Sequence, residues 1–533
     1  MARKFSKTRK QTLMDSNKRI FSHFGSDLPS GLVVFLVALP LCLGIALSSG
    51  APLFSGIIAG VVGGIVIGSL SGSHTAVSGP AAGLTVIVLN AISDLGAFDI
   101  FLTAVVLAGI IQIILGWLKA GVIGYYFPTA VIKGMLAGIG VILIIKQIPY
   151  AFGVNEDANL EKYIPFVNDW SAVMDLGNLS KEFEFGAIII TLVSLGILML
   201  WDRPMIKKQK FIKFIPGPLV VVIVGVLINK FFKFFVPNLY IDASGKVVLP
   251  EIESFGNLIG QLTFPKFSAL DNPDVWLVAI TIAIIASLET LLSLEAGDKL
   301  DPHKRVSPPN RELFAQGIGN VINGLIGGLP VTAVIVRTSA NITSGARTKS
   351  SAVFHGILLF ASVLLIPGLL NLIPLASLAA ILLLIGYKLA KFSLFKSQAK
   401  LGMDQFLPFV TTILGIVIFD LLIGIGIGMG VAIVYILMRN FQNSHFLENK
   451  PEKDPNTIHI VLSEEVSFLN KGALIQALDD IPPGKHVIID GSNSKVIDYD
   501  VLEVIANFKI AAKEKDIEVD TIKIKSVTSG NLH

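Results

Sequence analysis

The sequence predicts an α-helical integral membrane protein with a small α/β domain at its C-terminal end. Of the 533 residues, 53% are hydrophobic and only 15% are charged, whereas soluble domains have about 25% charged residues. Apolar stretches of about 20 residues, long enough to cross a hydrocarbon core of about 30 Å, recur up to residue 440. Beyond residue 455, short apolar runs alternate with polar ones instead.

We expect 14 membrane segments in the first part of the chain. The third and tenth are short, and glycine and proline interrupt them at Ser78-Gly79-Pro80 and at Gly327-Gly328-Leu329-Pro330. Paired broken segments at matching positions of two halves indicate a transport site. Because each half has seven segments, an odd number, the two halves form an inverted repeat of seven plus seven. The segments are predicted near residues 30–50, 51–70, 76–92, 99–118, 128–148, 184–201, 214–233, 275–295, 311–328, 331–344, 350–371, 374–391, 405–421 and 422–438.

Basic residues predict the orientation, since cytoplasmic loops carry an excess of lysine and arginine. The N-terminal segment, residues 1–25, is basic and lacks the apolar core of a signal peptide. The gaps after segments 6, 8, 10 and 12, all of them even-numbered, are also basic. We therefore expect a multi-pass protein of the cytoplasmic (inner) membrane, surrounded by the lipid bilayer, with both termini in the cytoplasm. These basic residues are Arg203, Lys207, Lys208, Lys210 and Lys213 after segment 6, Lys299, Lys304, Arg305 and Arg311 after segment 8, Arg347 and Lys349 after segment 10, and Lys388, Lys391, Lys396 and Lys400 after segment 12.

Arg337 is the strongest candidate for a binding residue. It follows the break before segment 10, and an arginine at membrane depth costs about 2.5–3.5 kcal/mol on insertion scales. The start of a broken helix directs its N–H groups and its positive dipole end to the same region. Both features favour a small inorganic anion as the partner. The alternative is that Arg337 extends to the cytoplasmic surface, because Arg347 is only ten residues further on.

Small residues at the two breaks would let an anion approach the backbone. Ser78, Gly79, Ala81 and Ala82 begin segment 3, and Thr332 and Ala333 are their counterparts before segment 10. Close helix packing, which also favours small residues in membranes, is the alternative. Pro40 is expected to kink segment 1 and expose backbone there, and a kink that serves packing alone is equally compatible with the sequence.

Glu289 and Ser293 lie deep in segment 8. A carboxylate at this depth is costly unless it is paired, protonated or bound to a cation. We therefore expect either a structural ion pair with Arg337 or a coupling site for H⁺ or Na⁺. We expect no other cofactor. The sequence contains no metal-ligand cluster, nucleotide-binding loop or catalytic triad, so we expect no enzyme, and the net charge of +4 does not indicate nucleic-acid binding.

Four motifs resemble the SulP (sulfate permease) family of anion transporters. They are Val37-Ala38-Leu39-Pro40-Leu41, Ser78-Gly79-Pro80-Ala81-Ala82-Gly83-Leu84-Thr85, Asn310-Arg311-Glu312-Leu313 with Gln316-Gly317-Ile318-Gly319-Asn320, and Gly327-Gly328-Leu329-Pro330 ending in Arg337-Thr338. The resemblance implies a transporter domain over residues 26–440. Segments 1–4 and 8–11 would form its core and segments 5–7 and 12–14 its gate. It further implies alternating access by movement of core against gate, a homodimer, and bicarbonate or sulfate as the anion.

The resemblance also bears on the coupling ion. In the sodium-coupled bicarbonate members of that family, an Asp and a Thr of helix 8 bind the cation together with small or hydroxyl residues at the start of helix 10. Here the matching positions hold Glu289 and Ser293, then Ala333, Val334 and Ile335. Ile335 offers hydrocarbon where a hard cation needs oxygen, which favours a proton, or no coupling cation at all, over sodium.

The C-terminal residues predict a separate domain. Residues 441–455 are expected to be a linker, and residues 456–533 resemble a short STAS domain of the cytoplasmic side. We expect strands at 457–462, 486–490 and 517–524 and helices at 472–478 and 501–513. Asp500 replaces the hydroxyl residue of the family's phosphorylation loop, so we do not expect phosphorylation at that position.

Two other functions fit the same pattern of segments. A nucleobase-type permease of the same fold would need carboxylates on helices 8 and 10, and Arg337 on segment 10 argues against it. A membrane-bound anion sensor, in which the C-terminal domain signals, would need no transport.

Overall fold

The computed structural model describes residues 23–121, 128–154, 183–203, 215–250, 259–419, 421–442, 445–448 and 456–525. The chain divides into two compact units, and each is described by itself. The first contains the residues up to Gln398 together with Phe409–Gly426. The second contains Ala399–Pro408 and the residues from Ile427 onward.

The first unit is helical, and each predicted membrane segment overlaps a helix. Seven of the described helical stretches are long and apolar enough to cross a membrane. The π-helical stretch η1 joins α3 and α4 into one helical stretch. The sequence did not predict helix α19. The helices are α2 (Phe24–Ser48), α3 (Leu53–Val62), η1 (Gly63–Ile67), α4 (Gly68–Leu70), α5 (Thr85–Leu95), α6 (Phe98–Trp117), α7 (Thr129–Ala151), α9 (Phe185–Trp201), α11 (Gly217–Phe235), α13 (Pro273–Leu300), α14 (Pro309–Ile326), α15 (Ile335–Thr343), α16 (Ser350–Leu365), α17 (Pro367–Leu370), α18 (Leu375–Leu389), α19 (Phe392–Lys400), α20 (Met403–Ile418) and α21 (Leu421–Gln442).

The two predicted breaks are short strands. Strand β1 (Ser78–Pro80) precedes the 3₁₀ turn η2 (Ala82–Leu84) and helix α5, and strand β2 (Val331–Ala333) precedes helix α15. Both strands are fully buried. Glycine and proline favour this extended backbone over a continuous helix, because proline lacks the N–H that a helix interior needs.

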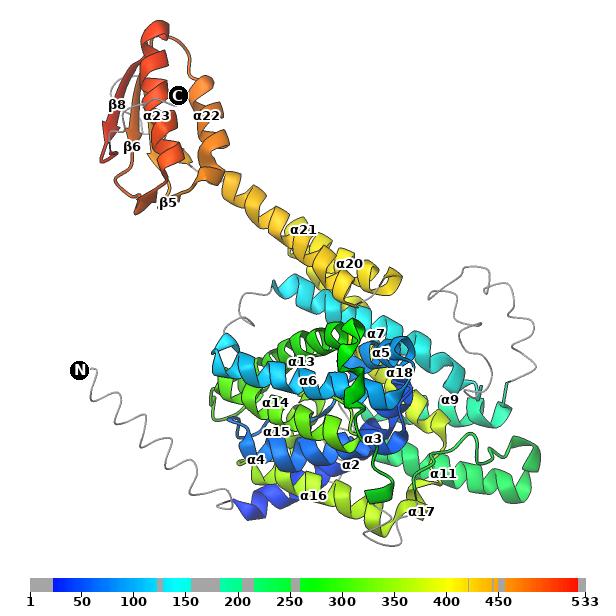
Figure 1. Cartoon of the computed structure of the whole chain (residues 1–533). Coiled ribbons are helices and arrows are strands. Elements are labelled where there is room, and N and C mark those ends of the chain that lie inside the picture. The colour runs from blue at the N-terminus through cyan, green and yellow to red at the C-terminus, as the bar shows by residue number, and fades with distance from the viewer. Residues whose placement is uncertain are drawn as a thin grey trace. The chain divides into compact units, whose positions relative to one another are not determined.

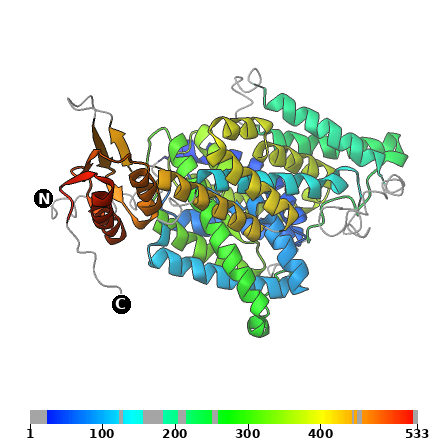
Figure 2. The ribbon, with the colours of Figure 1, turned by 90° about the horizontal axis from the view of Figure 1, so that it is seen from above.

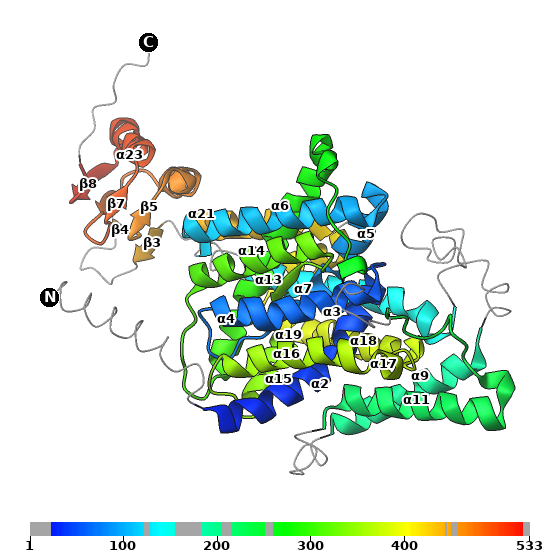
Figure 3. The same cartoon turned by 60° about the horizontal axis from the view of Figure 1, so that its bottom comes forward.

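Helices α6 and α14 lie side by side, as Figures 1 and 3 both show. A Cβ atom added at Gly109 would lie 2.5 Å from the backbone nitrogen of Val321, and one added at Gly317 would lie 2.7 Å from the carbonyl oxygen of Gly109. This close approach leaves no room for larger side chains, as is common between membrane helices. It brings the polar side chains of α14 within reach of α6.

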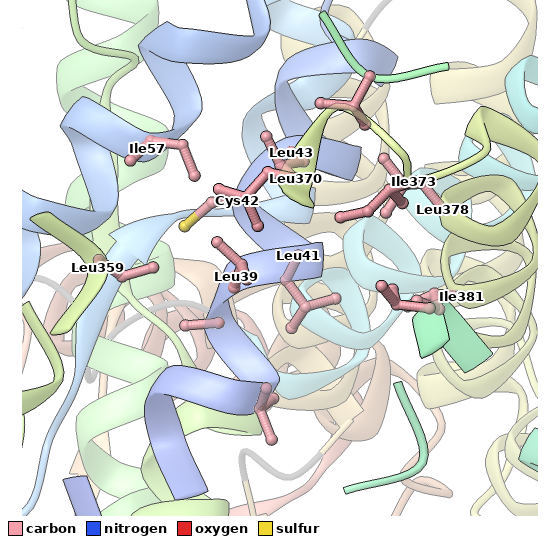
Figure 4. Close-up of a cluster of buried hydrophobic side chains, with 14 of the residues drawn as sticks. Leu39, Leu41, Cys42, Leu43, Ile57, Leu359, Leu370, Ile373, Leu378 and Ile381 are labelled. Carbon is pink, nitrogen blue, oxygen red and sulfur yellow. The ribbon is translucent and has the colours of Figure 1, made fainter. Parts of the chain in front are cut away.

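A buried apolar cluster joins α2 to α3, α16 and α18. It includes Leu43 of α2, Ile57 of α3, Leu359 of α16 and Leu378 of α18, each at most 1% exposed. Figure 4 shows the sulfur of Cys42 directed between Ile57 and Leu359 at one edge of this cluster. The cluster fixes the helix that carries Cys42 next to the broken helices.

Contacts between loops agree with the predicted number of segments. Asp27, before segment 1, accepts hydrogen bonds from the backbone of the gap after segment 10. Lys349 of the same gap donates to the carbonyl of Ser71, after segment 2. At odd-numbered gaps, the N–H of Val247, after segment 7, donates to the carbonyl of Ile373, after segment 11. Even-numbered gaps therefore contact even-numbered gaps, and odd-numbered gaps contact odd-numbered ones. This is the result expected if each segment crosses the membrane once.

The second unit contains a four-stranded sheet in the order β3-β4-β6-β8. Strands β4, β6 and β8 are parallel and β3 is antiparallel to β4. The predicted strands and helices of this domain are all present. Alternate residues of β4 and β6, such as Ile460 and Ile489, form one core with α22 and α23, so both helices cover the same face (Figures 1 and 2). The elements are β3 (His445–Glu448), β4 (Thr457–Leu462), β5 (Glu465–Val466), α22 (Lys471–Asp479), β6 (His486–Asp490), β7 (Val496–Ile497), α23 (Tyr499–Ala511) and β8 (Glu518–Ile522).

The prediction of a linker over residues 441–455 is wrong in part. Strand β3 lies within this range and adds an edge to the sheet, with Phe446 opposite Val461 and Leu447 opposite Ile460. Its two apolar residues are flanked by polar sequence, so only the pairing with β4 distinguishes it from a linker. Residues 449–455 lie outside the described residues.

We expect Asp27→Ala to destabilise the first unit by about 3 kcal/mol. Each buried backbone N–H group that loses its acceptor costs about 1–3 kcal/mol. The Asp27 side chain is fully buried. It accepts from the N–H groups of Arg347 at 2.7 Å and Thr348 at 3.1 Å, and from the Thr348 hydroxyl. Thermal unfolding of the purified protein measures the effect. The exposed Asp274, changed to alanine, is the control, and an equal loss in both variants would contradict this role.

Candidate functional site

The two broken helices meet at a two-stranded ribbon. Strands β1 and β2 pair antiparallel, with Ser78 opposite Ala333, Gly79 opposite Thr332 and Pro80 opposite Val331. Because the strands run in opposite directions, α5 and α15 leave the ribbon from opposite ends. The N-terminal turns of both helices therefore lie at one short ribbon in the interior of the unit.

Arg337 lies against this ribbon and is fully buried. Its Nη2 atom is 3.4 Å from the sulfur of Cys42 and 3.5 Å from the carbonyl oxygen of Pro80. Its Nη1 atom occupies the space where a side chain at Gly79 would be. The alternative that Arg337 extends to the membrane surface is therefore wrong.

The guanidinium of Arg337 has unused donors. Its Nε and Nη1 atoms are buried and have no hydrogen-bond partner among the described residues. A buried charged group without partners is costly, and an anion or water held beside it would supply the missing acceptors.

Glu289 of α13 lies at the start of the other broken helix. A Cβ atom added at Gly83, within turn η2, would be 2.5 Å from its Oε2 atom. That oxygen is buried and has no partner among the described residues. The predicted ion pair with Arg337 does not form, since no described carboxylate lies within 4.0 Å of the guanidinium. The carboxylate instead faces the first turn that leads into α5.

The other predicted residues lie in and around the ribbon. Ser78 is buried and its hydroxyl accepts a hydrogen bond of 2.6 Å from Gln316. Ala81 and Ala82 form the turn between β1 and α5, where the Ala81 carbonyl accepts from the Leu84 N–H. Thr332 is fully buried at the centre of β2.

Two predicted residues have less direct relations to the ribbon. Ser293 is buried one turn beyond Glu289 on α13. Pro40 is buried within α2, which continues as a helix through it. The residue of α2 that contacts Arg337 is Cys42, two positions later.

Sequence analysis missed four residues that hold the ribbon or contact Arg337. Thr290 of α13 accepts from the N–H of Ala333 at 3.2 Å. Asn320 of α14 bonds both backbone groups of Val331. Gln316 and Cys42 complete the set. The spacing of Glu312, Gln316 and Asn320, four residues apart on one face of a membrane helix, was the available signal.

The arrangement can attract and orient a negatively charged solute. It offers two helix N-termini, an arginine with unpartnered donors, and small residues between them. Among the described residues, no group of three histidine, cysteine or acidic side chains could hold a metal ion.

Comparison with known proteins agrees with this architecture. The model of the sulfate permease family matches residues 24–412. The putative sulfate transporter YvdB of Bacillus subtilis is 30% identical over 418 residues, which span 78% of this chain and 74% of that protein. The bicarbonate transporter BicA of Picosynechococcus sp. is 28% identical over 470 residues, spanning 86% of this chain and 78% of BicA.

A solved structure extends the likeness to the C-terminal part. The murine anion transporter Slc26a9, in an inward-facing state, matches 95% of this chain and 87% of its own with a TM-score of 0.75. At 17% identity this likeness concerns the fold alone. The family match covers the ribbon, both broken helices and Arg337, and we conclude that this multi-pass membrane protein belongs to the sulfate permease family.

Proposed function

We propose that this protein is a secondary active transporter that moves a small inorganic anion, bicarbonate or sulfate, across the cytoplasmic membrane. The observation that carries the proposal is the meeting of two broken helices at one buried ribbon beside Arg337. The names of its relatives, a putative sulfate transporter and a bicarbonate transporter, support the choice of these two anions.

The anion would bind where positive charge converges. Each helix N-terminus is equivalent to about half a positive charge, and the Arg337 side chain adds one full charge. The small residues Gly79, Ala81, Ala82 and Ala333 keep side-chain bulk away from this part of the backbone, and Ser78 and Thr332 lie on the two strands. The total, about two positive charges, suits an anion of one or two negative charges.

Glu289 would couple anion binding to a proton. Its carboxylate lies at the turn that begins α5, where the anion would be attracted. An ionised Glu289 repels the anion, and a protonated one does not. Binding of anion and proton would therefore favour each other, which is the requirement for symport. Sodium is less suited, because Ala333, Val334 and Ile335 offer no side-chain oxygen at the start of α15.

Transport would follow from movement of a core against a gate, with segments 1–4 and 8–11 in the core and segments 5–7 and 12–14 in the gate. The protein would form a homodimer, with both termini in the cytoplasm. Residues 456–533 would form a STAS-like domain on that side. The sheet and helices of the second unit support this assignment.

We predict that Arg337→Met lowers anion affinity by about tenfold to a hundredfold, because charge-assisted hydrogen bonds contribute about 1.5–3 kcal/mol. Methionine keeps much of the buried volume, so the fold should persist. Stabilisation against thermal unfolding by bicarbonate and by sulfate, and uptake of each into proteoliposomes, measure the effect. Unchanged affinity for both anions would refute the role of Arg337.

We predict that Gly79→Ala also weakens anion binding, by about tenfold. A methyl group there would collide with Nη1 of Arg337, and such overpacking costs about 1–3 kcal/mol. Gly196→Ala is the matched control, because nothing lies within 4 Å of a Cβ atom at that position of α9. Equal transport kinetics in the two variants would show that the position of the guanidinium is not critical.

We predict that Glu289→Gln removes the pH dependence of uptake. In the wild type, anion uptake should fall as rising pH ionises Glu289, by up to about tenfold per pH unit for one coupled proton. Glutamine mimics the protonated carboxyl, so the variant should bind the anion equally well across this range while losing proton flux. Uptake and internal pH are measured together in proteoliposomes with an imposed pH gradient. A variant that keeps the wild-type pH profile would exclude coupling at Glu289.

A further inference from the structure

Helix α14 presents a face of buried polar side chains toward the ribbon. Glu312, Gln316 and Asn320 follow one another at intervals of four residues, and all three are fully buried. In the interior of a membrane protein such groups are costly unless bonded. The hydrogen bonds of these side chains therefore indicate the structural role of this face of α14.

Asn320 behaves like a neighbouring strand. Its Oδ1 atom accepts from the N–H of Val331 at 2.7 Å, and its Nδ2 atom donates to the carbonyl of the same residue at 3.2 Å. Strand β2 has β1 on its other edge. The outward N–H of Ala333, two residues on, is satisfied by Thr290. Side chains from two helices thus close the free edge of β2.

The same side chain ties the ribbon to helix α13. Asn320 Nδ2 donates to Oε1 of Gln112 on α6 at 2.6 Å, and Gln112 Nε2 donates to the hydroxyl of Ser287 on α13 at 3.2 Å. Ser287 lies two residues before Glu289. Together with the hydrogen bond that the Ala333 N–H donates to Thr290, these contacts form a closed ring through α13, α6, α14 and β2.

We propose that Asn320 is a specificity-determining positioning residue, which sets the distance between strand β2 and helix α13 and hence the width of the anion site. This inference rests on the proposed function. Helix α15 begins two residues after β2, so a shift of Val331 displaces Arg337 relative to Glu289. A site whose width is fixed discriminates between anions of different size, and a loosened ring discriminates less.

Asn320→Asp tests the ring with little change of shape. Aspartate still accepts from the Val331 N–H, but it cannot donate to Gln112 or to the Val331 carbonyl. We expect the ratio of KM for sulfate to KM for bicarbonate in proteoliposomes to change by roughly tenfold. For the anion with the lower KM, we expect kcat to change by no more than about threefold, which corresponds to about 0.65 kcal/mol. A uniform loss for both anions would reduce Asn320 to a structural residue and overturn the proposal.

Asn323→Ala is the matched control. Asn323 is also a fully buried asparagine of α14, but neither side-chain atom has a hydrogen-bond partner among the described residues. Its removal should leave the KM ratio within about twofold, because the substitution breaks no hydrogen bond. An equal change of the ratio in both variants would show that any substitution on this face acts alike, against the proposal.

Substitutions at Gln112 keep the test decisive if Asn320→Asp does not fold. Gln112→Glu retains the acceptor for Asn320, whereas Gln112→Leu removes it. The leucine variant should shift the KM ratio and the glutamate variant should shift it less. The reverse order would contradict the ring.

A second measurement separates this inference from the proposed function. Hydrogen exchange reports the Val331 and Ala333 amides whether or not an anion is transported. We expect faster exchange in Asn320→Ala and unchanged exchange in Asn323→Ala. Equal protection in both would overturn the inference while leaving transport intact, and a wild type that takes up neither anion would overturn the proposed function while the ring stands.

Discussion

Lipid offers no hydrogen bonds, so every backbone group within the hydrocarbon layer must find its partner inside the protein. The ribbon of β1 and β2 is the place where this constraint is hardest to meet, because its strands satisfy each other along one edge only. Helices α13 and α14 supply the rest through Thr290 and Asn320. These helices carry buried polar residues because the backbone groups of the ribbon need hydrogen-bond partners. The proposed anion site depends on those hydrogen bonds.

A guanidinium and a carboxyl group lie near the ribbon without pairing with each other. Arg337 packs against Gly79, and Glu289 packs against Gly83, at the two sides of the turn that leads into α5. An ion pair between them would have stabilised both charges and left nothing for a solute. Their separation leaves unpartnered donors on Arg337 and an unpartnered oxygen on Glu289. These unsatisfied hydrogen-bonding groups are the physical basis of the proposed coupling between an anion and a proton.

Glycine has a distinct task at this site. At Gly79 and Gly83 it makes room for a charged group directly above the backbone, and at Gly109 and Gly317 it lets α6 and α14 approach closely. The close packing of α6 and α14 also supports the ribbon, because it allows Gln112 to reach Asn320. A chain with 49 glycines can thus combine dense helix packing with ionisable groups placed directly against the backbone.

The sequence by itself determined the membrane segments, the two breaks, three of the strands and both helices α22 and α23 from residue 457 onward, and Arg337 and Glu289 as costly ionisable groups. Hydropathy, glycine, proline and alternation are local signals that need no knowledge of neighbours. Only the tertiary structure decided that Arg337 and Glu289 stay apart, that the guanidinium donates to the sulfur of Cys42, and that β3 joins a sheet. It likewise decided that Gln316 bonds Ser78, 238 residues away. A hydrogen bond requires atoms about 3 Å apart, and only packing brings such distant segments together.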